Sequence, residues 1–168
     1  MSKLAVPIEQ ELVITRNESM RHSILDLESL MKEGIVRQWF PEADLPLHHQ
    51  FAPGAYARTI FIPQGTLVVG KIHKHPHLNM LVCGTVSLAT EEGPLFLEAL
   101  KIMTSKAGTK RVVYAHTDTV WTTIHLTDKT DLAEIEEDII AKTYEEFDAL
   151  QDPAVQQLLP LLQQKEAL

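Results

Sequence analysis

Apolar and polar residues follow three successive patterns along the chain. Near its start, apolar residues recur every three to four positions, which predicts a helix that begins with a capping box at Thr15 and Glu18 and ends at Gly34. Further on, the period shortens to two, in short runs rich in β-branched and aromatic residues that are typical of strands. The predicted strands are 56–62, 66–73, 78–83, 86–90, 111–116 and 120–126. Many short strands with glycine and proline turns between them favour an antiparallel sandwich or barrel.

The last part of the chain returns to a helical period. Thr130 or Asp131 can cap a helix, and an apolar stripe runs from Leu132 to Leu150, so we expect an acidic helix there. Pro153 then predicts a short terminal helix, whose apolar side chains pack either on the domain itself or on another subunit. We therefore expect one domain with extensions: an N-terminal helix and connection at 1–44, a barrel at 45–127 and C-terminal helices at 128–168.

Composition and charge narrow the class of protein. A chain of 168 residues suits one domain with one sizeable core. The net charge is −8, and residues 128–152, with ten acids and two bases, carry −8 by themselves. The chain has no basic stripe, which argues against nucleic acid as a partner. The single cysteine, Cys83, excludes an internal disulfide, and no apolar run is long enough to span a bilayer, so we expect a cytoplasmic protein without a membrane partner.

Histidines mark the stretch that carries chemistry. His73, His75 and His77 occupy alternate positions between Gly70 and Gly84. Alternate residues of an extended chain face the same side, and imidazoles that converge on one face can bind a divalent transition metal. The sequence has no nucleophile elbow, no phosphate-cradling glycine loop and no HExxH helix. Any catalysis would therefore use histidine acid–base chemistry or a metal Lewis acid.

The same stretch resembles the first signature motif of the cupins, which are small double-sheet jelly-roll barrels. Aligned back from its last glycine, Lys71 and His73 take the two histidine positions of that motif, and His77 takes the glutamate position. A weaker match to the second motif puts Arg111 at the histidine position and Ala115 at the asparagine position. The resemblance implies a barrel whose cavity is lined by Lys71, His73, His77 and Arg111.

A closer resemblance is to a group of small cupin proteins encoded by bacteriophages and prophages. It covers about residues 45–135 and implies a phage or prophage gene in a bacterial host, but no reaction. The matching stretches are Phe51–Gly54, Tyr56–Arg58, Pro63–Gly65, Gly70–His75, Gly108–Arg111 and Asp118–His125.

Two interpretations of the histidines stay open at this point. His73 and His77, helped by His125 or His49, are candidate ligands of one divalent metal. Alternatively, these imidazoles hydrogen-bond one another and line a polar pocket.

The nearby cations point to a different occupant. Lys71 and Arg111 would repel a metal ion, whereas both suit the carboxylate or phosphate of a small anionic molecule. In the alternative, Arg111 pairs with Glu98. Trp121 either stacks on the ligand or belongs to the core. It shares one face of its strand with Thr123 and His125, and the sequence does not show whether this face points into the barrel.

Three functions follow from these features. The first is a phage-type cupin that binds a small anionic ligand, a divalent metal or both in the barrel. The second is a metal-dependent enzyme of isomerase or oxygenase type. The third is a structural or assembly protein of a phage with a non-catalytic barrel. In each case we expect a homodimer or a larger homo-oligomer.

Overall fold

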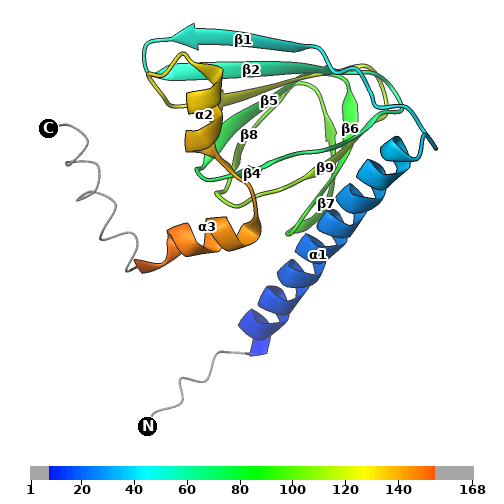
Figure 1. Cartoon of the computed structure of the whole chain (residues 1–168), viewed down its shortest axis with the longest axis vertical. Coiled ribbons are helices and arrows are strands. Elements are labelled where there is room, and N and C mark those ends of the chain that lie inside the picture. The colour runs from blue at the N-terminus through cyan, green and yellow to red at the C-terminus, as the bar shows by residue number, and fades with distance from the viewer. Residues whose placement is uncertain (1–7, 154–168) are drawn as a thin grey trace, which may run out of the picture.

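The computed structural model describes residues 8–153, with side chains from Arg16 onward. A long helix, α1 (Ile8–Val36), precedes the strands, and two short helices, α2 (Leu132–Ile139) and α3 (Tyr144–Gln151), follow most of them (Figure 1). The strands are β1 (Leu47–Ala52), β2 (Ala55–Ile62), β3 (Leu67–Val69), β4 (Ile72–His73), β5 (His77–Cys83), β6 (Thr85–Thr90), β7 (Gly93–Glu98), β8 (Lys101–Ser105), β9 (Val112–Ala115), β10 (Thr119–His125) and β11 (Ile140–Ala141). Within residues 8–153, no helix has both the length and the apolar content that crossing a membrane requires.

Nine of the described strands form two antiparallel sheets, and eight of these nine have the nested pairing of a jelly roll. The five-stranded sheet has the order β1-β2-β10-β5-β8, and the four-stranded sheet has the order β3-β9-β6-β7. Along the chain, β2 pairs with β10, β3 with β9, β5 with β8 and β6 with β7, so that the first barrel strand meets the last and the pairs close inward. This is the topology of a double-sheet jelly roll. The prediction of a mainly β chain, with a double-sheet jelly-roll barrel between terminal helices, is confirmed.

The hydrophobic core lies between the two sheets. Alternate residues of β10 are buried, and the same alternation occurs at the start of β5 and along β6. These side chains meet in one cluster, in which Leu81 is 0% exposed. Its buried members are Ile62, Leu81, Val86, Leu88, Val113, Ala115 and Trp121.

Gly84 connects the two sheets where β5 turns into β6. Its φ is 95°, in the left-handed region that side chains disfavour. A Cβ at this position would also collide with the backbone of Asp118 and Thr119. The glycine that closes the histidine-rich stretch is therefore required by the turn itself.

The helices cover different parts of the barrel. In α1, Ile24 is buried, and Arg21 holds the helix to the loop after β6 through a contact of 2.7 Å between its Nε and Glu91 Oε2. Helix α2 packs Ile135 and Ile139 against Tyr56 of β2. Helix α3 belongs to another cluster, in which Tyr144 and Phe147 meet Ile72 and Ala141.

Three details of the sequence-based prediction are wrong. The first helix already includes Ile8, so Thr15 lies inside it and does not cap its start. The acidic helix expected across 131–150 is divided, because Ile140 and Ala141 leave the helix to pair with β4. Thr143 then caps α3, its hydroxyl accepting from the Glu146 N–H.

Strands β1, β7 and β8 were not predicted, because most of their residues are exposed and show no clear alternation. The helix expected after Pro153 lies outside the described residues.

Candidate functional site

The site begins with a row of side chains across the inner face of the five-stranded sheet. His125 lies directly opposite Tyr56 of β2, and His77 lies directly opposite Ser105 of β8. Directly opposite residues of antiparallel strands share a face. The rings of His77 and His125 are 4.9 Å apart between centroids, so these four residues form one row beneath the mouth of the barrel.

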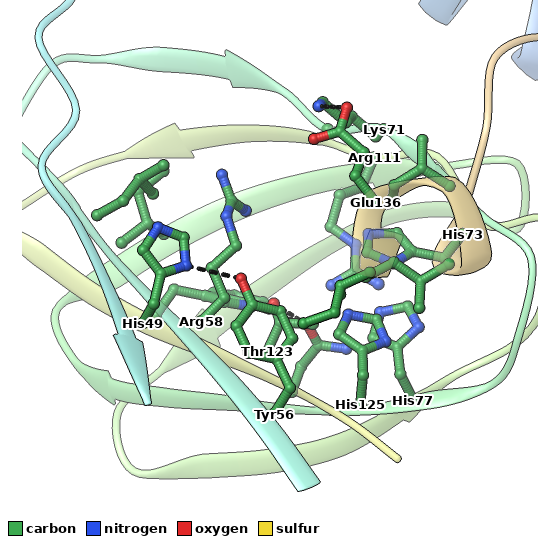
Figure 2. Close-up of a pocket in the computed structure, with 18 of the residues that line it drawn as sticks. His49, Tyr56, Arg58, Lys71, His73, His77, Arg111, Thr123, His125 and Glu136 are labelled. Carbon is green, nitrogen blue, oxygen red and sulfur yellow. Dashed lines mark hydrogen bonds and ion pairs between the residues drawn. The ribbon is translucent and has the colours of Figure 1, made fainter. Parts of the chain in front are cut away.

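His73 completes a cluster of three imidazoles. It comes from β4, which is held by β11 through the pairing of His73 with Ile140. Its ring centroid lies 4.1 Å from that of His77 and 5.1 Å from that of His125. One ring nitrogen from each histidine can be chosen so that all three atoms lie within 4.8 Å of one another. Residues 52 positions apart in the sequence thus meet at one point in the cavity (Figure 2).

Burial keeps these three rings neutral. It is the largest cause that lowers the pKa of His73 to about 2 and that of His125 to about 4, and neighbouring positive charges add to it. Burial also lowers the pKa of His77, against a hydrogen bond to the His75 backbone that raises it. A neutral imidazole carries one free lone pair, which is the form that binds metals.

The hydrogen bonds around the cluster leave ring nitrogens available. The Nδ1 atom of His77 lies 3.1 Å from the backbone oxygen of His75, so Nδ1–H donates and the lone pair sits on Nε2. A backbone carbonyl of this kind commonly orients a metal-binding histidine. The Nδ1 atom of His73 is buried without a hydrogen-bond partner. Among the described residues, no hydrogen bond joins any two of the three rings, so this donor set fits one divalent transition metal.

A buried guanidinium lies next to the histidines. Arg111 precedes β9 and reaches into the cavity, where its Nη2 donates to Ser105 Oγ and its Cζ lies 5.5 Å from the centre of the Trp121 ring. Burial lowers the pKa of Arg111 to about 10, a value at which it is still charged at neutral pH. No carboxylate among the described residues forms an ion pair with it, and Glu98 lies on β7, paired with Thr85. The positive charge of Arg111 therefore faces the cavity without a protein counter-ion.

Asn79 organises the floor of the site. It is 1% exposed, and its Nδ2 donates to Ser105 Oγ at 2.8 Å. Its Oδ1 accepts from Trp121 Nε1 at 2.9 Å and from Thr123 Oγ1 at 3.3 Å. Because Ser105 also accepts from Arg111, this network holds the guanidinium in place from below.

The rim of the cavity carries the remaining polar groups. Lys71 has a side chain that is 57% exposed, and its Nζ lies 2.5 Å from Glu136 Oε1 of α2. On the opposite wall, the Nδ1 atom of His49 is 2.7 Å from the Tyr56 hydroxyl. The space enclosed between these walls is about 380 Å³, which lies in the range of small-molecule sites.

The structure places the residues named from sequence at different depths. Four of them line the cavity: His73, His77, His125 and Arg111. Trp121 lies on the same inward face of β10 as His125. The indole of Trp121 lies in the core, with its N–H donated to Asn79. Lys71 lies at the rim, and its charge is paired with Glu136.

Sequence reasoning assigned no role to three lining or supporting residues. Arg58 shares the inner face of β2 with Tyr56, and a charged residue at an inward position of an alternating strand is a usable signal. Ser105 and Glu136 had no such signal, because β8 was not predicted and Glu136 is one acid among many in its segment.

Comparisons with known proteins bear on the fold of this chain. No known family profile matches it, and no curated protein is similar to it in sequence. Among solved structures, it is similar to KdgF from Halomonas sp., with 14% identity and a TM-score of 0.45 over 54% of this chain and 84% of that one. It is similar to an acetylacetone dioxygenase from Acinetobacter johnsonii, with 16% identity and a TM-score of 0.42 over 52% and 65%.

A cupin superfamily protein from Desulfitobacterium hafniense matches at 11% identity, with a TM-score of 0.44 over 53% of this chain and 83% of that one. These similarities cover about half of the chain, and they carry no assignment of activity. The jelly-roll classification of this chain therefore rests on its own strand order.

Proposed function

We propose that the barrel binds a small anionic molecule together with one divalent transition metal. His73, His77 and His125 would hold the metal, and Arg111 would hold the anionic group beside it. The observation that carries this proposal is the juxtaposition of three neutral imidazoles with a buried guanidinium that has no carboxylate partner among the described residues. A buried charge is costly unless it is paired, so an anion in this cavity would stabilise the site.

The two occupants should favour each other. A divalent cation next to Arg111 concentrates positive charge in a space of about 380 Å³, and an anionic ligand offsets that repulsion. By thermodynamic linkage, the anion then raises the affinity for the metal by the same factor as the metal raises the affinity for the anion. This mutual dependence answers the objection that cations beside the histidines repel a metal.

The chain's own residues would divide the remaining work. Arg111 would orient the anionic group, and Ser105 and Asn79 would position Arg111 through their hydrogen bonds. Helix α2, packed on Tyr56 through Ile135 and Ile139, would limit the access of water to the cavity. A bound metal would supply Lewis-acid polarisation of an oxygen in the ligand.

Metal analysis tests the first half of the proposal. Full-length, untagged protein, grown with added zinc, manganese, iron and nickel, should contain close to one divalent ion per chain. His73→Ala should lose it, whereas His75→Ala, which changes an exposed histidine of the same stretch, should keep it. A metal content near zero after supplementation would overturn this half.

A thermal shift assay tests the second half. Butyrate or inorganic phosphate should raise the melting temperature of the wild-type protein. Arg111→Gln should remove the shift, and Arg37→Gln, at an exposed arginine at the end of α1, should retain it. The anion-binding half fails if neither probe shifts the wild-type melting temperature at millimolar concentration.

A metal-dependent enzyme of isomerase or oxygenase type is the second candidate. Among the described residues, the cluster supplies three ligands. Three protein ligands are typical of catalytic zinc sites, which keep a position open for water or substrate. A binding protein and an enzyme share this site, so turnover of a bound anion by the metal-loaded protein, and its loss in His73→Ala, would separate them.

The expectation of a homodimer belongs to the same proposal. The outer face of β5 and β8 is apolar: Met80 lies opposite Ile102, and both Leu78 and Ile102 are exposed. An exposed apolar face of this kind supports self-association, because a second copy would bury its apolar side chains. Light scattering of the full chain at micromolar concentration should give at least a dimer mass, and Ile102→Lys should give a monomer while Leu30→Lys on α1 should not.

The phage or prophage setting rests on the sequence resemblance alone. In that setting, an assembly role would make the barrel a scaffold. A scaffold should keep its function in both His73→Ala and Arg111→Gln and lose it in Ile102→Lys. A ligand-binding barrel should instead lose metal or anion binding in the first two variants.

A further inference from the structure

A second arginine lines the cavity, and the proposed function leaves it without a task. Arg58 lies on β2 between Tyr56 and Ile60, on the face that points into the barrel. It is half-buried, and among the described residues no carboxylate forms an ion pair with it. Glu136, the acid among the described residues that line the cavity, is already paired with Lys71. The cavity therefore contains two guanidinium groups without a protein counter-ion.

The two arginines enter the cavity from different sheets. Arg58 comes from the five-stranded sheet, whereas Arg111 enters from the segment before β9 of the four-stranded sheet. Burial is the largest cause that lowers the pKa of His125 and of His77. The charge of Arg58 adds to this effect at His125, and the charge of Arg111 adds to it at His77. Both charges act on His73. The imidazoles thus lie within the electrostatic range of both cations.

Arg58 has polar neighbours of its own. His49 of β1 lies directly opposite it in the sheet, and the Nδ1 atom of His49 is 2.7 Å from the Tyr56 hydroxyl. Figure 2 shows Arg58 next to His49 and Tyr56, with the three clustered histidines grouped on the other side of the pocket. These three residues form a second polar subsite, separate from the one that Ser105 and Asn79 support around Arg111.

We propose that the ligand is a small dianion with two separate acidic groups, one bound by Arg111 and the other by Arg58 with His49 and Tyr56. This inference rests on the proposed function, since it requires that the cavity bind an anion. A monoanion would leave one of the two guanidiniums unpaired, whereas a dianion pairs both. The cavity of about 380 Å³ can hold a small dicarboxylate, or a carboxylate that also carries a phosphate.

Calorimetry with matched acids tests the second subsite. Succinate and butyrate have the same number of carbons, as have glutarate and pentanoate, and each pair differs by one carboxylate. The full-length, metal-supplemented protein should bind at least one diacid about tenfold or more tightly than its matching monoacid, which is the size of a charge-assisted hydrogen bond. Phosphoglycolate serves as the probe that carries both a phosphate and a carboxylate.

Variants of Arg58 locate the preference. Arg58→Gln should remove the difference between diacid and monoacid while leaving the affinity for the monoacid within about twofold of wild type. Arg58→Lys, which keeps the charge, should retain part of the preference, and Arg37→Gln should retain all of it. The melting temperature of each variant shows that it folds.

Two results would overturn this inference while leaving the proposed function standing. One is equal affinity of the wild type for every diacid and its monoacid, with phosphoglycolate no tighter than either. The other is an equal loss of both affinities in Arg58→Gln, which would make Arg58 a general support of the site. Absence of any binding to the wild type, by contrast, would overturn the anion-binding function itself.

Discussion

The barrel interior has two halves of opposite character, built on the same strands. On β5, Leu81 belongs to the apolar cluster, and four residues earlier His77 belongs to the histidine cluster. On β10, Trp121 and His125 repeat this division. One half is filled by close-packed apolar side chains, whereas the other encloses a cavity lined by imidazoles and guanidiniums. The comparison shows that the close-packed core and the polar cavity are separated along each strand, which allows mutations to test stability and the proposed binding independently.

Among single substitutions, the largest effect on stability is expected in the apolar half. Leu81→Ala removes a side chain that is 0% exposed and leaves a cavity in the core. We expect it to lower the free energy of unfolding by about 2–5 kcal/mol, measured by urea denaturation. Leu126→Ala, at a side chain that is 89% exposed, is the matched control and should change it by less than about 0.5 kcal/mol. Equal effects of the two changes would show that the proposed core does not carry the stability.

Acid should destabilise the metal-free protein through the polar half. The folded-state pKa values of His125 and His73, about 4 and about 2, lie below the ordinary value of 6.5. At a pH between the folded-state value of each ring and 6.5, the unfolded chain binds more protons than the folded one, so stability rises with pH in that window. The stabilisation is therefore complete above pH 6.5 and is lost as the pH falls towards 4, by about 1.4 kcal/mol per pH unit for each such ring.

Urea midpoints of chelator-treated protein between pH 7 and pH 4 measure this loss. His125→Gln should make the dependence on pH shallower, because it removes one of the titrating groups. His48→Gln, at an exposed histidine, should leave the slope unchanged. If the wild type and His125→Gln share one slope, the neutral, buried state of this ring is refuted.

Removal of the buried guanidinium should affect binding and stability in opposite directions. Arg111→Met replaces a buried cation that has no carboxylate partner with an apolar chain of similar length. We expect the free energy of unfolding without ligand to stay equal or to rise by about 1 kcal/mol, because an unpaired buried charge is unfavourable. Binding of anions should be lost in the same variant. A strong loss of stability would mean that the bond from Arg111 to Ser105 outweighs the cost of burying the charge.

The smallest effect is expected at the rim. Lys71 and Glu136 form an ion pair whose two side chains are more than half exposed. Lys71→Ala should change the free energy of unfolding by about 0–1 kcal/mol, and high salt should reduce the difference further. Its effect on anion affinity should be smaller than that of Arg58→Gln, since its charge is already paired. A larger effect on binding would place Lys71 among the groups that contact the ligand.

Local patterns in the sequence were sufficient for the class of fold. Period-two runs between glycine turns predicted the antiparallel barrel, because side chains of a strand alternate between two environments. They failed for β7 and β8, where most residues of both strands are exposed and no alternation is left to read. They also missed the break at Ile140 and Ala141, since its cause is pairing with β4, about 70 residues earlier.

By itself, the sequence determined the class of fold through its alternation, and it marked His73, His77 and Arg111 as candidate site residues. Only the tertiary structure decided that His73 of β4, His77 of β5 and His125 of β10 meet, that Arg58 and Arg111 line the same cavity, and that Lys71 is paired at the rim. The physical reason is that spacing along a strand sets which face a side chain takes. The depth and neighbours of that side chain depend on how distant strands pair and on what covers the barrel.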